Sequence, residues 1–71
     1  MSSFLSPREM EVLRRLASSN KDIARQLGIT EATVKVHIKA ILRLTSTSNR
    51  TQALVWALRE GVVSLGQQST S

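Results

Sequence analysis

Cysteine and tyrosine are absent from the 71 residues, and proline, tryptophan and histidine each occur once. Without cysteine the chain forms no disulfide and no cysteine-based zinc site, and His37 alone lacks the partners that a zinc ion needs. Aspartate also occurs once and no glycine-rich phosphate loop is present, so the side chains that carry most catalysis are scarce. We therefore expect a protein that is not an enzyme and that holds no metal and no cofactor.

Long hydrophobic runs are missing as well. No apolar run approaches the roughly 20 residues of a membrane-spanning helix. The opening Met-Ser-Ser-Phe lacks the basic and apolar regions of a signal peptide. We expect a soluble, cytoplasmic protein with no membrane partner. The length leaves room for one domain, which we expect at residues 1–65, followed by a disordered tail at 66–71.

Positive charge is what the sequence has in excess. Ten Lys and Arg residues face five Asp and Glu residues, which gives a formal net charge of +5 and a pI of about 11.3. This profile is typical of proteins that bind polyanions. Charge alone does not distinguish DNA from RNA or anionic lipid, so the distinction has to come from the pattern of residues.

The first two helices are marked by their caps. Ser6 precedes the single proline and is followed three residues later by Glu9, the pattern of a capping box, so we expect a helix over 7–17. Leu5 is placed to close a hydrophobic staple on a core face made of Met10, Leu13, Leu16 and Ala17. Ser19 and Asp22 form a second capping pair, for a short helix that ends at Gly28.

The third helix, expected over 31–44 after a cap at Thr30, has two different faces. On a helical wheel, the side towards the core carries Val34, Ile38, Ile41 and Leu42. The other side and its border carry Lys35, Val36, Lys39 and Arg43. Two helices joined through a glycine turn, the second longer and basic on its outer face, are typical of a helix-turn-helix with its recognition helix.

A fourth helix is expected after the polar run at 45–48, with Ser48 as its cap and Gly61 as its end. Its core face consists of Ala53, Leu54, Ala57 and Leu58. The sequence contains no strand signal and no internal repeat. The expected fold is therefore all-α, with four helices.

These segments resemble the LuxR-type DNA-binding domain, also called the NarL/FixJ type. The matching pieces are Leu5-Ser-Pro-Arg-Glu9 with Val12-Leu13, Ser19-Asn-Lys-Asp-Ile-Ala24, Leu27-Gly-Ile-Thr30, Thr33-Val-Lys-Val-His37, Ile41-Leu-Arg43 and Asn49-Arg-Thr-Gln-Ala53. They cover about five-sixths of the chain in the family's order, which is far more specific than a lone helix-turn-helix pattern. The resemblance implies a four-helix domain of a bacterial transcription regulator, whose third helix reads DNA and whose fourth commonly dimerises.

The sequence departs from the family's pattern at two places. The link between the first two helices is shorter than usual and lacks a glycine before Ser19-Asn-Lys. After Arg43 the usual Lys-Leu-Gly-Val is replaced by Leu44-Thr-Ser-Thr47, which removes an apolar contact and a helix-ending glycine. We expect local differences in the length of the first helix and in the path into the fourth, but none in the recognition face.

The outer face of the third helix supplies the expected base contacts. An exposed Val36 between two lysines has no structural benefit. In a major groove it meets a thymine methyl group, while Lys35 and Lys39 reach guanine or phosphate. The alternative for these residues is a merely solvated basic face.

A second set of residues is expected at the DNA backbone, in part because the resemblance implies it. Helix N-termini are natural phosphate sites, but caps and surface residues occupy the same positions. Arg50 either clamps a phosphate or forms a surface salt bridge, and His37 is either a packing residue or a backbone contact. The full set is Asn20, Lys21, Thr30, Thr33, His37, Arg43 and Arg50.

The fourth helix is apolar on more sides than one core needs, because 53–58 is an unbroken apolar run. We expect Val55 and Gln52 in a dimer interface, and Trp56 either joins them or folds back over Val62 or Val63. The expected partners are therefore double-stranded DNA and a second copy of the chain, at least on DNA. No small molecule is expected.

Other interpretations stay open at this point. The promoter-reading domain of a sigma factor shares the Ser-Pro-Arg-Glu opening and the Ile-Ala-x-x-Leu-Gly-Ile turn, but it does not explain 49–53. A basic helical module for protein or membrane surfaces differs in that it lacks salt-sensitive binding to duplex DNA. Members of the family usually carry a receiver or ligand-sensing domain ahead of this one, so we expect either an excised piece or a stand-alone regulator.

Overall fold

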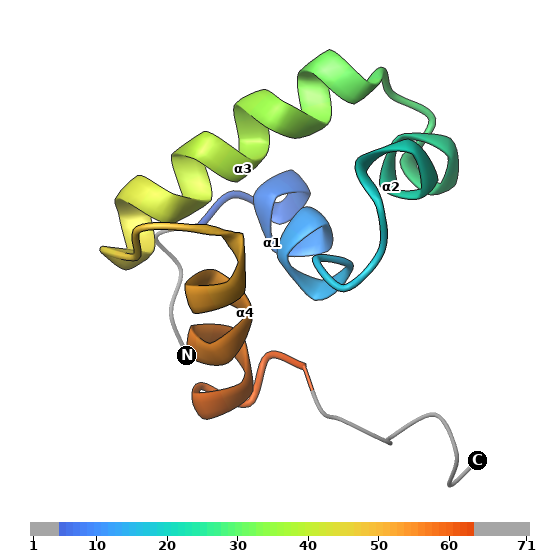
Figure 1. Cartoon of the computed structure of the whole chain (residues 1–71). Helices are drawn as coiled ribbons and strands as arrows, with labels where there is room; N and C mark the ends of the chain where they lie inside the picture. The colour runs from blue at the N-terminus through green and yellow to red at the C-terminus, as the bar shows by residue number, and fades with distance from the viewer. Residues whose placement is uncertain (1–4, 64–71) are drawn as a thin grey trace, which may run out of the picture.

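The computed structural model describes residues 5–63, and these form four α-helices. They are α1 (Pro7–Arg14), α2 (Asn20–Leu27), α3 (Glu31–Thr45) and α4 (Arg50–Arg59). The long α3 crosses the top of the molecule in Figure 1, and the other three helices lie on one side of it. No strand occurs within 5–63, so the all-α, four-helix expectation is confirmed. None of these helices is long and apolar enough to cross a membrane. The expected tail at 66–71 lies outside the described residues.

The caps of the first three helices form as predicted. In the capping box of α1, the Glu9 backbone N–H donates to Ser6 Oγ at 3.1 Å and the Ser6 N–H donates to Glu9 Oε1 at 3.0 Å. Ser19 accepts from the Asp22 N–H at 3.1 Å at the start of α2. Gly28 ends α2 with φ +70°, a left-handed conformation in which glycine is unstrained. These bonds satisfy backbone donors that a helix end otherwise leaves exposed.

The end of α1 differs from the prediction, because the helix stops at Arg14 instead of Ala17. The backbone tightens beyond this point: the Arg15 N–H donates to Val12 O at 3.0 Å, and the Leu16 N–H to Leu13 O at 3.2 Å. The short link leaves no room for another full turn, since Ser19 is already extended as the cap of α2. The tighter turn buries Leu16 and leaves Ala17 exposed, so Ala17 was wrongly predicted as a core residue.

The cap of α4 also differs from the prediction. Asn49 caps this helix, not Ser48, and its Oδ1 accepts from the Gln52 N–H at 2.9 Å. Ser48 contributes its backbone instead of its side chain, because its N–H donates to Gln52 Oε1 at 2.8 Å. Asparagine and serine are about equally good caps, so local sequence does not separate two adjacent candidates. At the other end, α4 stops at Arg59 and Gly61 follows with φ +76°.

The core lies between α3 and the other three helices. Ala53 and Ala57 of α4 are fully buried, and their small side chains allow close packing. Trp56, Val62 and Val63 are each half-buried against this core. Val12, which was not predicted on the core face of the first helix, is buried as well. The buried apolar residues are Leu5, Val12, Leu13, Leu16, Ile23, Ala24, Val34, Ile38, Ile41, Ala53 and Ala57.

The end of α3 shows how the chain does without the family's helix-ending glycine. Ser46 takes the left-handed conformation itself, with φ 58° and ψ 39°. It is the one residue other than glycine with positive φ between residues 5 and 63. Thr45 is buried before it, but its hydroxyl donates to Ile41 O at 2.8 Å and is therefore satisfied. Ser46 thus ends α3 in place of a glycine, at the cost of backbone strain.

Replacing Ser46 by glycine should stabilise the domain. The change relieves a left-handed strain of about 1–2 kcal/mol but adds freedom to the unfolded chain, so we expect a net gain of about 0.5–1 kcal/mol. Thermal unfolding should then shift upward by roughly 3–6 °C. The matched control is Ser48→Gly, which makes the same chemical change at a residue without positive φ and should lower the midpoint. Equal shifts in the two variants would contradict the expected strain.

Candidate nucleic-acid interface

The outer face of α3 is exposed as the helical wheel predicts. Lys35, Val36 and Lys39 are all exposed, and Val36 shows 64% of its surface to solvent. Val34 and Ile41 on the opposite face are completely buried. The outer face of α3 thus presents an apolar side chain and two lysines to solvent, while its opposite face belongs to the core.

The cations of this face form no ion pair among residues 5–63. The ion pairs found within 5–63 join Glu11 to Arg15 and Asp22 to Arg25, both away from α3. Lys35, Lys39 and Arg43 follow each other at four-residue spacing on α3 and are all exposed. A stripe of three cations along one helix face is available to a polyanion.

The N-terminus of α3 carries a pair of threonine hydroxyls. Thr30 caps the helix by accepting from the Thr33 N–H at 3.1 Å, as predicted. The two hydroxyl oxygens also lie 2.9 Å apart, within hydrogen-bond distance of each other. His37, further along α3, is half-buried. The capping interpretation of Thr30 is confirmed, and a phosphate contact by either threonine stays a prediction.

The N-terminus of α2 brings together residues that the sequence predicted separately. Lys21 is exposed, and Asn20 is half-buried beside it. The guanidinium of Arg50, from the first turn of α4, donates to Asn20 Oδ1. The salt-bridge alternative for Arg50 is therefore wrong, because both ion pairs formed within 5–63 involve other residues. Arg50 is bound to the chain's own oxygens instead.

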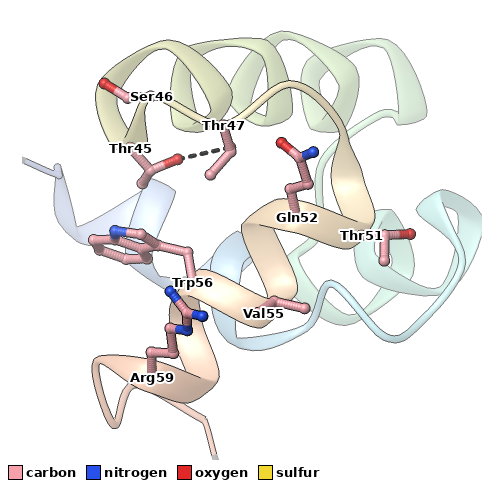
Figure 2. Close-up of a pocket in the computed structure, with 8 residues that line it drawn as sticks. All are labelled: Thr45, Ser46, Thr47, Thr51, Gln52, Val55, Trp56 and Arg59. Atoms are coloured by element: carbon pink, nitrogen blue, oxygen red, sulfur yellow. Dashed lines mark hydrogen bonds between the residues drawn. The ribbon is translucent and has the colours of Figure 1, made fainter.

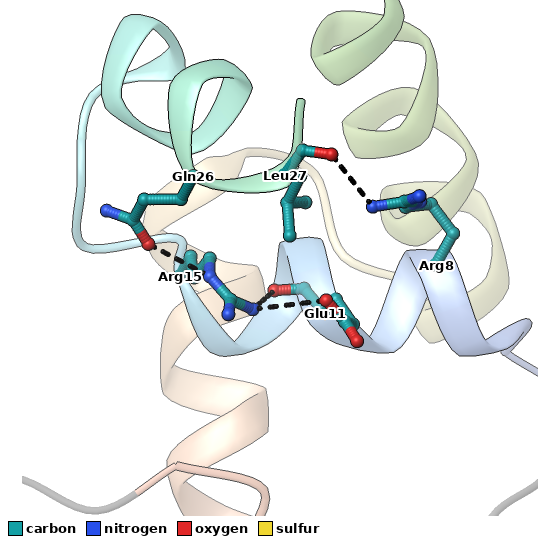
Figure 3. A network of polar contacts seen from close by, with 5 residues as sticks. All are labelled: Arg8, Glu11, Arg15, Gln26 and Leu27. Atoms are coloured by element: carbon teal, nitrogen blue, oxygen red, sulfur yellow. Dashed lines mark hydrogen bonds and ion pairs between the residues drawn. The ribbon is translucent and has the colours of Figure 1, made fainter. Parts of the chain in front are cut away.

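Two further arginines fix α2 against α1, and sequence reasoning missed both (Figure 3). Arg8 Nη1 donates to Leu27 O at the end of α2 at 3.4 Å. Arg15 Nε donates to Gln26 Oε1 at 3.0 Å, and its Nη1 to the Glu11 carbonyl at 2.9 Å. The contacts to α2 span 19 and 11 residues of sequence, and neither has a local signal. Both contacts connect α1 to the helix that precedes α3.

A helix-turn-helix with a basic outer face occurs in many families of DNA-binding proteins. Comparison with known proteins shows which of these families the chain belongs to. Residues 3–57 match the family model described as bacterial regulatory proteins, luxR family. The chain belongs to the luxR family. It is a helix-turn-helix DNA-binding domain of these transcription regulators, with α2 and α3 as its two helices. The match includes 49–53, the segment that a sigma-factor domain leaves unexplained, and so favours the regulator over the sigma factor.

Individual luxR-family proteins are similar over most of this chain. The uncharacterized transcriptional regulatory protein YxjL of Bacillus subtilis is 47% identical over 58 residues, which are 79% of this chain and 27% of YxjL. The nitrate/nitrite response regulator NarL of Escherichia coli is 45% identical over 60 residues, 82% of this chain and 28% of NarL. The chain therefore spans little more than a quarter of the length of these relatives.

A solved structure supports the same assignment. The structure of the transcription factor GerE is similar with a TM-score of 0.80 and 41% identity, and the alignment covers 90% of this chain and 98% of GerE. The luxR-family fold thus accounts for almost all of the chain, and α3 has the place of the recognition helix in it.

Proposed function

We propose that this luxR-family domain binds double-stranded DNA at specific sequences by inserting α3 into the major groove. The observation that carries the proposal is the outer face of α3, where Lys35 and Lys39 flank an exposed Val36 without an ion pair among the described residues. The lysines are suited to guanine O6 and N7, and the valine to a thymine methyl group. The protein acts in this way as a binding module and not as an enzyme.

The DNA backbone is contacted, in this proposal, by residues on either side of the recognition face. Lys21 at the start of α2 and Arg43 near the end of α3 are exposed cations suited to phosphates. The N-termini of α2 and α3 add donors that favour anions. The remaining proposed contacts are Asn20, Thr30, Thr33 and His37.

Lys21 offers a direct test of the phosphate contacts. Lys21→Ala should weaken binding to all duplexes by a similar factor and lower the slope of log affinity against log salt by about one unit. The matched control is Arg14→Ala, which removes an exposed cation at the end of α1 that has no proposed contact, and it should leave the slope unchanged. Titrations at several salt concentrations measure both. An unchanged slope for Lys21→Ala would remove this residue from the phosphate contacts.

A second copy of the chain is the proposed partner on DNA, through α4. Val55 is 45% exposed, and it lines a cavity of about 320 Å³ together with Gln52, Trp56 and the end of α3. Figure 2 shows Trp56 reaching towards Thr45, whereas Val55 projects from another side of α4. Val55 is thus the centre of the proposed interface. Gln52 and Trp56 contribute at its edge, since the Gln52 side-chain oxygen already accepts from the Ser48 N–H.

The rest of the proposal concerns the protein to which this domain belongs. Because the chain spans little more than a quarter of YxjL or NarL, it serves as the output domain of a longer regulator or as a stand-alone version. Such a regulator works in the bacterial cytoplasm, where its DNA is.

Selection of bound sequences from a random duplex pool tests the proposed function most directly. We expect enrichment of one motif in two related copies, and salt-sensitive binding to duplexes but not to vesicles of anionic lipid. A pool without enrichment, or binding to vesicles as strong as to duplexes, would contradict sequence-specific DNA recognition.

A further inference from the structure

Arg50 connects α4 to the turn between α1 and α2 and to the first residue of α2. Its Nε donates to Leu16 O at 3.0 Å. One terminal nitrogen donates to Asn20 Oδ1, and the other to Ser18 O. These acceptors lie 30 to 34 residues away along the chain. The guanidinium is half-buried and spread over three oxygens, so it is held in one place.

The carbonyls that Arg50 binds belong to the shortened link between α1 and α2. Because α1 stops at Arg14, the carbonyls beyond it lack helical partners, and unpaired polar groups in such a turn are costly. Arg50 satisfies those of Leu16 and Ser18. A guanidinium has five N–H donors in a rigid fork, while a lysine ammonium donates from one point. Lysine at this position keeps the charge but does not reproduce the three contacts.

The same fork decides which way the Asn20 amide faces. Arg50 only donates, so the amide presents its oxygen to Arg50 and its N–H2 group elsewhere. Within the described part of the chain, no buried side-chain nitrogen or oxygen lacks a hydrogen-bond partner, and no hydrogen bond from the Asn20 amide nitrogen is found. That nitrogen is therefore accessible to solvent. A phosphate oxygen only accepts, and the N–H2 group is the end of the amide that it binds.

We propose that Arg50 is a positioning residue for DNA binding, which orients the Asn20 amide so that its N–H2 group donates to a phosphate. The inference rests on the proposed function, because it takes Asn20 as a backbone contact. It gives Arg50 a different part from the direct phosphate clamp expected from sequence, since three of its donors are already bound inside the protein. Without the fork, the amide is free to rotate its oxygen towards the phosphate, and the contact is lost.

The test measures duplex affinity for Arg50→Lys, Asn20→Ala and the double variant on one selected duplex. Each single change should lower the affinity about tenfold, the cost of one charge-assisted hydrogen bond. The double variant should also lose about tenfold, not a hundredfold, because both changes remove the same contact. In Arg50→Ala the salt slope should stay that of the unaltered chain, whereas Lys21→Ala lowers it by about one unit. Arg14→Lys is the matched control, and it should bind like the unaltered chain.

Three results would overturn the inference. The first is that Arg50→Lys binds like the unaltered chain while Arg50→Ala lowers the salt slope, because this pattern is that of a direct phosphate contact. The second is a hundredfold loss of duplex affinity in the double variant, because two independent contacts would add in this way. If circular dichroism shows that the Arg50 variants do not fold, the Asn20 side-chain amide signals of the unaltered chain are followed by NMR. These signals should shift when duplex is added. The third overturning result is that they stay unchanged, which would exclude the contact. Absence of duplex binding by the unaltered chain contradicts the proposed function itself.

Discussion

Replacing Lys39 by alanine is expected to lower the affinity for a selected target duplex by roughly 5- to 150-fold, the cost of about 1–3 kcal/mol that one lost base contact carries. Lys39 is exposed in the middle of α3, one helical turn after Lys35 and one before Arg43. Base edges are read by the outer face of a recognition helix, where Lys39 lies together with Lys35 and Val36, whereas phosphate contacts carry no sequence information directly. The loss on random duplexes should therefore be much smaller.

Competition titrations of the target and a scrambled duplex at one salt concentration measure this difference. Lys21→Ala is the matched control: it removes the same charge at the start of α2 and should weaken both duplexes alike. Lys39→Ala should instead reduce the ratio of the two affinities. If the ratio stays that of the unaltered chain, Lys39 is a phosphate contact and the base contacts of α3 have to be assigned to other residues.

The recognition face could be predicted because it depends on local periodicity. Val34, Ile38 and Ile41 repeat at helical spacing, so the opposite face, with Val36 and Lys39, had to be exposed. The caps at Ser6 and Ser19 were predictable for the same reason, since each is satisfied within three residues. The cap of α4 is the local exception, because Ser48 and Asn49 are adjacent and are about equally good caps.

The end of α1 was predicted wrongly at a place where a distant part of the chain also contributes to the local structure. The sequence allows α1 to continue to Ala17, but the turn carbonyls after Arg14 are satisfied by Arg50 from another helix. No local pattern reports a contact that spans more than thirty residues. Ser46 is a different case. The missing helix-ending glycine was visible in the sequence, but serine is not a preferred residue for the left-handed conformation, so its positive φ was not predicted.

The second large effect is expected on α4, where Val55→Glu should abolish cooperative binding to a duplex with two half-sites. One recognition helix touches only a few base pairs, too little to distinguish a site among the roughly 10⁶ or more competing positions in a genome. Two copies related by a two-fold axis supply the missing specificity. In such a pair Val55 meets its own counterpart, so the variant places two carboxylates close together without opposite charges.

The variant should leave the domain itself intact. Val55 is 45% exposed, and the introduced glutamate lies four residues before Arg59, a spacing that favours an ion pair along the helix. Binding to a single half-site should therefore stay close to that of the unaltered chain. Gln26→Glu is the matched control, because it adds the same charge at an exposed site whose side-chain oxygen already accepts from Arg15. It should retain cooperativity.

Sedimentation and titrations on one-site and two-site duplexes separate the possibilities. We expect a largely monomeric domain in dilute solution, because the exposed apolar surface at Val55 is small, and pairing only when DNA holds two copies side by side. The unaltered chain should then bind the two-site duplex more tightly per site than the one-site duplex, and Val55→Glu should bind both equally. Were the two proteins to behave alike on both duplexes, α4 would not be the dimer surface, and the second copy would have to pair through another face of the domain.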